Sequence, residues 1–250
     1  MNGPPRDLRV SPSAAALSRE AAIVFASAVA EAVERSGRFT VALSGGSTPR
    51  ALYRLLADPT APYRVLIPWS AVHLFWGDER HVPPSHDDSN FRMVSDTLLR
   101  SIPIPGSNLH RIEAELEDAG EAASRYQADL ASFFRLAPGE APRFDLVLLG
   151  LGEDTHTASL FPGSEALLET DRLVAAPYVA AQSGHRITLT LKVLNAARLA
   201  VFLVSGAAKA PALRAVLAGP FDPLRHPAQA VSAERILWLA DRDAAAQIQA

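Results

Sequence analysis

The 250-residue sequence contains no cysteine. Disulfide frameworks, thiolate nucleophiles, thiolate zinc sites and iron–sulfur clusters are therefore excluded together. A cysteine-free chain is compatible with the cytosol, and we expect a cytoplasmic protein. Any catalysis has to come from His, Asp, Glu, Lys, Arg, Ser or Thr side chains, or from a bound cofactor.

The sequence also lacks an excess of charge of either sign. Its 24 Lys and Arg residues are balanced by 27 Asp and Glu residues, which gives a formal net charge of −3. Nucleic-acid-binding proteins need a basic excess or a basic stripe, so we expect no nucleic-acid partner. Apolar residues make up 48% of the chain and charged residues 20%. This balance is typical of a soluble globular protein and excludes disordered, collagen-like and coiled-coil classes.

Long hydrophobic runs are missing as well. No stretch approaches the roughly 20 apolar residues that a membrane-spanning helix needs, so we expect no membrane partner. The apolar run at residues 21–30 follows two arginines and imitates a signal peptide, but Glu31 comes directly after it. An amphipathic helix over residues 13–36, ended by Gly37, explains the same residues. We expect its buried side to carry Ile23, Val24, Val29 and Val33.

Short apolar runs of strand length alternate with helical patterns along the chain. We expect strands at residues 39–43, 72–76, 144–149, 172–174, 187–191, 199–204 and 236–239. Near-continuous apolar strands between helices are typical of a parallel sheet covered on both faces. Since no repeat, low-complexity tract or convincing linker interrupts the pattern, we predict a single domain over residues 1–250. Its fold class is α/β, a three-layer α/β/α Rossmann-like domain with a mostly parallel sheet.

Polar or glycine-rich segments follow four of these expected strands. The segments are residues 44–48, 77–80, 150–156 and 205–209. In an open parallel sheet, ligands bind beyond the carboxyl ends of the strands, where helix N-termini and loop amides converge. Four such segments at one edge therefore indicate a binding site.

The first of these segments suits an anion. It reads Ser44-Gly45-Gly46-Ser47-Thr48 and is followed by Pro49, which fits the first turn of a helix. Its glycines allow close approach of the backbone, and its amides and hydroxyls are donors. No Gly-Lys-Ser/Thr follows, so it is not a nucleotide P-loop. A tight strand–helix turn with a capping serine is the alternative interpretation.

The third segment contains an acid–histidine pair, Asp154-x-His156. A carboxylate can hold one imidazole nitrogen and leave the other poised to take a proton from water. The alternative is a surface histidine beside a helix-capping aspartate. Gly150 and Gly152 imitate the start of a dinucleotide fingerprint, but Thr155 stands where its third glycine would be.

Two cations complete the candidate site. Lys209 begins a helix, where a positive charge is unfavourable unless an anion binds there. Arg186 precedes an expected strand and is either a ligand of that anion or a solvated charge. His81 and His86 share a loop with two aspartates, Asp87 and Asp88, but their spacing fits no standard metal-ligand pattern. We therefore expect no metal site.

Taken together, these segments resemble the 6-phosphogluconolactonase family, which shares a fold with the glucosamine-6-phosphate isomerase/deaminases. The resemblance covers residues 41–243. Its carriers are Ser44-Gly45-Gly46-Ser47-Thr48-Pro49, Trp76-Gly77-Asp78-Glu79-Arg80 with Val82-Pro83 and Ser89-Asn90, Gly152-x-Asp154-x-His156-Thr157-Ala158-Ser159-Leu160-Phe161-Pro162, Arg186-Ile187-Thr188-Leu189-Thr190, Ser205-Gly206-x-x-Lys209 and Leu237-Trp238-Leu239-x-Asp241. Several ordered blocks make the match specific.

The resemblance implies hydrolysis of 6-phospho-D-glucono-1,5-lactone to 6-phospho-D-gluconate, the second step of the oxidative pentose phosphate pathway. It also implies that His156 is the general base that activates water and that Asp154 orients it. The implied substrate and phosphate ligands are Ser44, Gly45, Gly46, Ser47, Thr48, Asp78, Arg80, Arg186 and Lys209. The only partner expected is the phosphosugar lactone, with no cofactor and no metal, in a monomer or small homo-oligomer.

One position departs from the family pattern. The family usually has glycine between the aspartate and the histidine, whereas this chain has Thr155. If the backbone there has a positive φ, a β-branched residue is strained. Either the loop is adjusted at this position, or the geometry of the Asp154–His156 pair differs from that of the family.

Two other functions compete with lactone hydrolysis. An amino-sugar-phosphate isomerase/deaminase uses the same scaffold, but residues 157–162 and Arg80 look like the lactonase version. A sugar-phosphate sensor would normally carry an added DNA-binding module, for which there is no room before Val41 and no basic helix.

Overall fold

A sheet of seven parallel strands crosses the centre of the computed structural model, which describes residues 6–180 and 184–248. Every neighbouring pair in this sheet is parallel. The spatial order is β1, β11, β10, β6, β2, β3, β5. The strands are β1 (Arg6–Ser11), β2 (Phe39–Leu43), β3 (Val72–Trp76), β5 (Leu109–His110), β6 (Leu146–Leu149), β10 (Leu199–Val204) and β11 (Arg235–Asp241).

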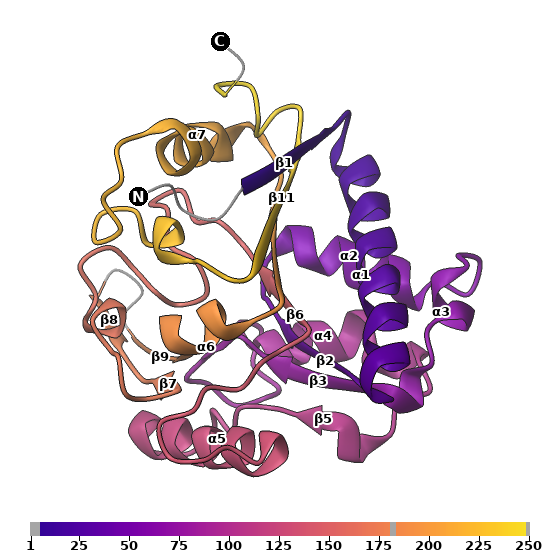
Figure 1. The fold of residues 1–250 in the computed structure, drawn as a ribbon, viewed down its shortest axis with the longest axis vertical. Coiled ribbons are helices and arrows are strands. Elements are labelled where there is room, and N and C mark those ends of the chain that lie inside the picture. The colour runs from indigo at the N-terminus through magenta and orange to yellow at the C-terminus, as the bar shows by residue number, and fades with distance from the viewer. Residues whose placement is uncertain (1–5, 181–183, 249–250) are drawn as a thin grey trace.

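Helices lie on both sides of this sheet, as Figure 1 shows, so the predicted three-layer α/β/α fold is confirmed. Helices α1, α2 and α4 are on one side, and α6 and α7 are on the other. The α-helices are α1 (Ala14–Ser36), α2 (Ser47–Ala57), α3 (Tyr63–Leu66), α4 (Asn90–Thr97), α5 (Ala119–Phe134), α6 (Leu191–Ala196) and α7 (Ala210–Ala218). Short 3-10 turns are at Trp69–Ala71, Leu99–Ser101, Gly106–Asn108, Glu165–Leu167, Ala207–Lys209 and Pro227–Ala230.

The connections reverse direction between β6 and β2. From β2 the chain moves outward to β3 and β5, whereas from β6 it moves the other way to β10 and β11. Because the two crossovers leave in opposite directions, a crevice opens beyond the carboxyl ends of β2 and β6. The topology alone therefore places a ligand site at the ends of these two strands.

A second, smaller sheet is antiparallel. It contains β4 (Asp78–Arg80), β7 (Val174–Ala175) and β9 (Gly184–Leu189), and β8 (Tyr178–Val179) also pairs with β9. We expected residues 172–174 and 187–191 to be strands but did not expect a sheet of their own. Residues 78–80, expected as part of the polar segment that follows the strand at 72–76, form β4.

Helix α1 largely matches its prediction. The Ser13 hydroxyl accepts a hydrogen bond from the backbone of the first turn, and Gly37 ends the helix with φ 72°. The predicted buried side was partly wrong, because Ile23 is 56% exposed whereas Phe25 and Val29 are buried. Much of the buried face consists of alanines, so the larger aliphatic residues did not mark it.

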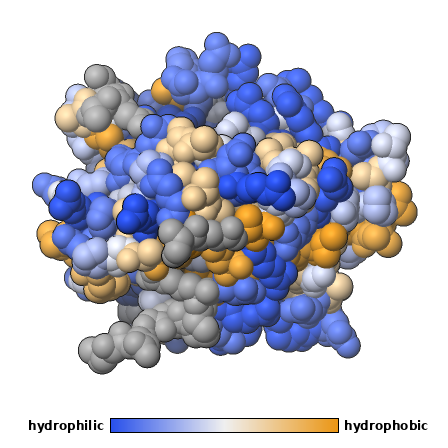
Figure 2. Space-filling model, turned by 90° about the horizontal axis from the view of Figure 1, so that it is seen from above, coloured by the Kyte–Doolittle hydropathy of each residue, from blue (hydrophilic) through white to orange (hydrophobic). Residues whose placement is uncertain are grey.

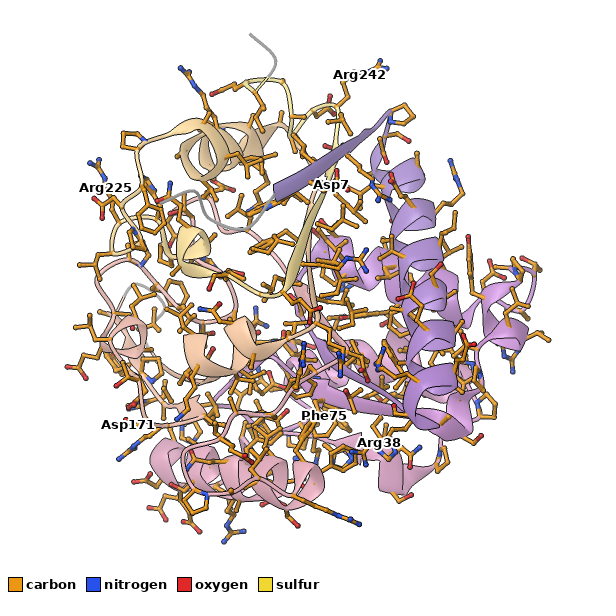
Figure 3. All side chains as sticks on the ribbon, viewed as in Figure 1. Asp7, Arg38, Phe75, Asp171, Arg225 and Arg242 are labelled. Carbon is orange, nitrogen blue, oxygen red and sulfur yellow. The ribbon has the colours of Figure 1, made fainter. Side chains whose placement is uncertain are left out.

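The interior between β3 and helix α5 is aromatic. Phe75 of β3 packs edge-on against Phe133 and Phe144, and it stacks on His110 with ring centroids 4.1 Å apart. Phe75 is fully buried, whereas Figure 3 shows Arg225 and Arg242 at the periphery of the molecule. This packing fixes the position of β3, whose carboxyl end leads into the site.

The face drawn in Figure 2 is mostly hydrophilic. Figure 2 shows one face, on which hydrophobic residues form separate patches among hydrophilic ones. No helix within the described ranges 6–180 and 184–248 is long and apolar enough to cross a membrane.

Candidate active site

A cleft of about 200 Å³ lies where the topology places the ligand, and segments that follow β2, β3, β6 and β10 line it. All predicted site residues except Asp154 and Arg186 line this cleft: Ser44, Gly45, Gly46, Ser47, Thr48, Asp78, Arg80, His156 and Lys209. Segments that are far apart in the sequence therefore meet in one cavity, as the strand-end pattern predicted.

The glycine turn after β2 leads directly into helix α2. Gly46 has φ 100°, a conformation that favours glycine, and Ser47 and Thr48 open the helix. Their main-chain N–H groups have no partner within a helix, so they are donors for an anion in the cleft. The phenol of Tyr53 accepts a hydrogen bond from the amide of Ser44 (3.0 Å) and donates to its carbonyl (2.9 Å), which holds the turn in place.

Gly45 makes room for a neighbour from helix α4. A Cβ at this position would lie 2.0 Å from Oδ1 of Asn90. Asn90 in turn donates from Nδ2 to the carbonyl of Asp78 at 2.9 Å. Asp78 also accepts from the hydroxyl of Ser159 at 2.6 Å. The glycine turn, β4 and the loop after β6 are thus connected through buried side chains.

Glu79 joins β4 to the start of helix α4. Its carboxylate is 2% exposed and accepts from the amides of Asn90 and Phe91, both at 2.7 Å. It also accepts from the amide of Arg80 and from the hydroxyl of Ser89. Burial raises the pKa of Glu79, and the three amide hydrogen bonds oppose that rise. Since four donors surround the two oxygens, this carboxylate is a structural acceptor that fixes Arg80.

Two guanidinium groups come from paired strands. Arg80 of β4 lies opposite Arg186 of β9 in the antiparallel register. Burial and the charge of Arg80 lower the pKa of Arg186, while nearby carboxylates act in the opposite direction. Arg80 also donates to the carbonyl of Asp88. Two cations held side by side favour an anion between them.

The predicted acid–histidine pair is formed. Nδ1 of His156 lies 2.5 Å from Oδ1 of Asp154, which leaves Nε2 of the ring for other chemistry. Burial alone would raise the pKa of Asp154, but the hydrogen bond and charge of His156 outweigh it and hold that pKa below its usual value. A Cβ at Gly152 would lie 2.1 Å from Nδ1, so only glycine admits the ring here.

The turn between these two residues confirms the strain expected from the sequence. Thr155 has φ 71°, in the left-handed region. Gly152 donates its amide to the carbonyl of His156 at 2.9 Å, so the segment folds back on itself. No helix follows β6 directly, which excludes the dinucleotide interpretation of Gly150 and Gly152.

The turn that precedes Lys209 is held by a carboxylate from the neighbouring strand. Asp241, at the end of β11, accepts from the hydroxyl of Ser205 at 2.5 Å and from the amides of Gly206 and Ala244. Burial alone would raise the pKa of Asp241, but these hydrogen bonds lower it below its usual value. Lys209 then lies at the start of helix α7, where a bound anion would stabilise its charge.

Sequence reasoning gave no role to several residues that build the site. Asn90, Ser159 and Asp241 were part of the family blocks, but nothing in their spacing showed that they connect separate loops. Nε2 of His81 donates to the carbonyl of Leu116. Within the part of the chain that the structure describes, no group of three or more His, Asp or Glu is placed to hold a metal ion.

Comparisons with known proteins show which family the chain resembles. Residues 12–238 match the family described as glucosamine-6-phosphate isomerases/6-phosphogluconolactonase. A curated 6-phosphogluconolactonase of Nostoc sp. is 43% identical over 219 residues, which cover 87% of this chain and 88% of that protein. The solved structure of 6-phosphogluconolactonase from Trypanosoma cruzi has a TM-score of 0.86 and 29% identity, covering 100% of this chain and 99% of that chain.

A monomeric glucosamine-6-phosphate deaminase also shares the fold. Its TM-score is 0.80, and the alignment covers 96% of this chain and 99% of that chain, but only 19% of residues are identical. This likeness concerns the fold alone. The match over residues 12–238 and the 43% identity to a curated relative show that the chain belongs to the glucosamine-6-phosphate isomerase/6-phosphogluconolactonase family.

Proposed function

We propose that this chain hydrolyses 6-phospho-D-glucono-1,5-lactone to 6-phospho-D-gluconate, the second step of the oxidative pentose phosphate pathway. The observation that carries the proposal is that His156 and Lys209 line one cleft together with the glycine turn. A base and the donors for a phosphate therefore share a cavity. The name of the 43% identical relative supports the same reaction.

In the proposed mechanism, His156 is the general base and Asp154 is its orienting partner. Asp154 accepts the Nδ1 proton of His156, so Nε2 keeps its lone pair, and His156 lines the cleft. Nε2 takes a proton from water as the water oxygen attacks the lactone carbonyl. The ring C–O bond then breaks, and the imidazolium returns its proton to the departing alkoxide, which leaves the open-chain acid.

The rest of the cleft binds the phosphate and positions the ring. The amides of the glycine turn, Arg80 and Lys209 line the cleft and supply donors and positive charge for an anion. Arg186 lies outside the lining, opposite Arg80 in the strand register, and adds a second guanidinium on that side. A phosphate bound away from the carbonyl supplies binding energy that orients the reacting end. Asp78 is fixed by Ser159 and Asn90 and is available to sugar hydroxyls from the same cleft.

The proposal includes three further expectations from the sequence. The chain acts as a single domain over residues 1–250, which is supported by one hydrophobic core cluster that extends from Leu17 to Ala245. It acts in the cytoplasm, where an anionic phosphosugar is retained because ions cross apolar barriers poorly. It is a monomer or a small homo-oligomer, which light scattering after size-exclusion chromatography measures directly.

A pH-stat assay tests the reaction, because hydrolysis of the lactone releases one acid equivalent. The expected result is a rate above spontaneous opening for the phosphorylated lactone and a much weaker one for unphosphorylated gluconolactone. A parallel incubation with glucosamine 6-phosphate, assayed for ammonia, tests the alternative activity. Ammonia release without lactone hydrolysis would assign the cleft to deamination instead.

A further inference from the structure

Thr155 lies in a backbone conformation that its side chain disfavours. It is β-branched and 4% exposed, and its φ is 71°. A β-branched residue at positive φ is an outlier, and such strain persists only where surrounding contacts hold it. Because Thr155 stands between Asp154 and His156, whatever holds it also sets the geometry of this pair.

The contacts that hold Thr155 come from a segment more than 65 residues away. Its hydroxyl lies 3.3 Å from the carbonyl of Arg225 and 3.2 Å from Nδ1 of His226, and 2.5 Å from the carbonyl of Asp154. Its own carbonyl accepts from the amide of Ala228 at 3.2 Å. Figure 3 shows Arg225 at the periphery, so this segment reaches inward from the surface.

The hydrogen-bond inventory determines which atom donates. A hydroxyl has one hydrogen and two lone pairs, and two carbonyl oxygens compete for the hydrogen of Thr155. When that hydrogen goes to a carbonyl, Nδ1 of His226 bonds to the hydroxyl by donating its own hydrogen. The 2.5 Å contact favours donation to the carbonyl of Asp154, and we infer from it that His226 is protonated on Nδ1.

The segment that carries His226 is itself fixed. The amide of His226 donates to the carbonyl of Asp222 at 2.7 Å. Gln229 accepts from the amide of Asp222 and donates to the carbonyls of Pro220 and Ala215, the latter in helix α7. A hydrogen bond to this segment therefore anchors the turn of Thr155 to helix α7, the helix that begins at the Lys209 end of the cleft.

We propose that Thr155 and His226 are positioning residues, and that their hydrogen bond holds the Asp154–His156 pair in its reactive geometry. The inference rests on the proposed function and adds to it a residue, His226, that lies outside the cleft lining. Thr155 stands where the family usually has glycine. Its hydroxyl compensates, through this hydrogen bond, for the backbone strain that its β-branched side chain brings.

Steady-state kinetics with four variants tests the proposal. Thr155→Val keeps the branched shape but removes the hydroxyl, and His226→Leu removes the ring donor. Both should lower kcat by about 10- to 100-fold with KM within about two-fold, the effect of a misplaced base. Thr155→Ser and His226→Asn keep an O–H and an N–H in similar positions and should retain most of the activity.

Thr190→Val is the matched control, since it removes another buried threonine hydroxyl, which donates to the carbonyl of Arg172. It should leave kcat unchanged. An unchanged kcat in both Thr155→Val and His226→Leu would overturn the proposal, as would an equal loss in the control. Should Thr155→Val fail to fold, the contrast between His226→Leu and His226→Asn decides.

Imidazole ¹⁵N NMR gives a readout that does not depend on the reaction. The wild-type spectrum should show His226 protonated on Nδ1, and Thr155→Val should shift the ring resonances of His156. A His226 that is protonated on Nε2 alone, or His156 resonances that do not move, would sink the inference. A wild-type protein without lactonase activity but with these shifts would instead contradict only the proposed function.

Discussion

The turn after β2 and the turn after β6 enter the same cleft from adjacent strands but are built differently. The turn after β2 runs straight into helix α2, and its contribution is main-chain N–H groups at the helix start. The turn after β6 folds back on itself and contributes the side chains of Asp154 and His156. The main-chain donors follow from a local pattern of strand, glycines and helix, whereas the turn that carries the side-chain pair contacts residues 225 and 226 from a distant segment.

The largest expected effect lies in the second turn. His156→Ala should lower kcat by about two to four orders of magnitude, the usual contribution of a general base. The side chain is partly exposed at the cleft, so circular dichroism and thermal unfolding should match the wild type. Near-normal turnover in this variant would remove His156 from the mechanism and leave the two turns without a functional difference.

A pair of glycine variants tests the comparison directly. Gly152→Ala places a Cβ 2.1 Å from Nδ1 of His156 and should lower kcat by about 100-fold, because it displaces the base. Gly45→Ala places one 2.0 Å from Asn90 and should mainly raise KM, because it shifts the anion donors. Gly106→Ala is the control, since a Cβ there meets nothing within 4 Å. The same change in kcat and KM for both variants would erase the distinction.

Lys209 belongs with the binding side of the comparison. Lys209→Ala should raise KM for the phosphorylated lactone by about 10- to 100-fold, the value of a charge-assisted hydrogen bond. Its kcat at saturation should change much less. The unphosphorylated lactone serves as the control substrate, and an equal loss toward it would contradict a phosphate-binding role.

The smallest expected effect is on stability, and it tests whether Asp241 holds the turn that precedes Lys209. The folded-state pKa of Asp241 is lowered, so its contribution to stability is present above the unfolded pKa of about 3.9 and is lost as pH falls through the folded pKa. Asp241→Asn should reduce the free energy of unfolding at pH 7 by about 1–3 kcal/mol. That difference should shrink below about pH 4 in urea titrations. Asp243→Asn, at an exposed position, is the control; a gap that stays constant with pH would contradict this account.

Much of the site was predictable because strand-end chemistry is local. At residues 39–49 a buried strand is followed by glycines and the start of a helix. This local pattern predicts that the segment lies at the carboxyl edge of the sheet and that its main-chain N–H groups are donors. The order of strands then brings residues 44, 78, 156 and 209 together, since parallel strands share one carboxyl edge. The strand order of the sheet thus brings residues that are far apart in the sequence into one site.

What escaped prediction depends on long-range contacts. Strand β1 carries Asp7 and Arg9 and lacks a continuous apolar run, so its pairing with β11 left no clear pattern. The pairing of β4 with β9 sets Arg80 opposite Arg186, and neither segment indicates its partner. The contact of Thr155 with His226 likewise requires the folded chain, because nothing local to either residue encodes it.

The charged outer strand β1 has a consequence for how molecules of this protein meet. It is one edge strand of the seven-stranded sheet, and β5, only two residues long, is the other. Exposed charges and very short edge strands are the features that keep sheets from pairing edge to edge. Concentrated solutions of the folded protein should therefore resist fibril growth, and any self-association should proceed through side-chain surfaces instead of shared β-ladders.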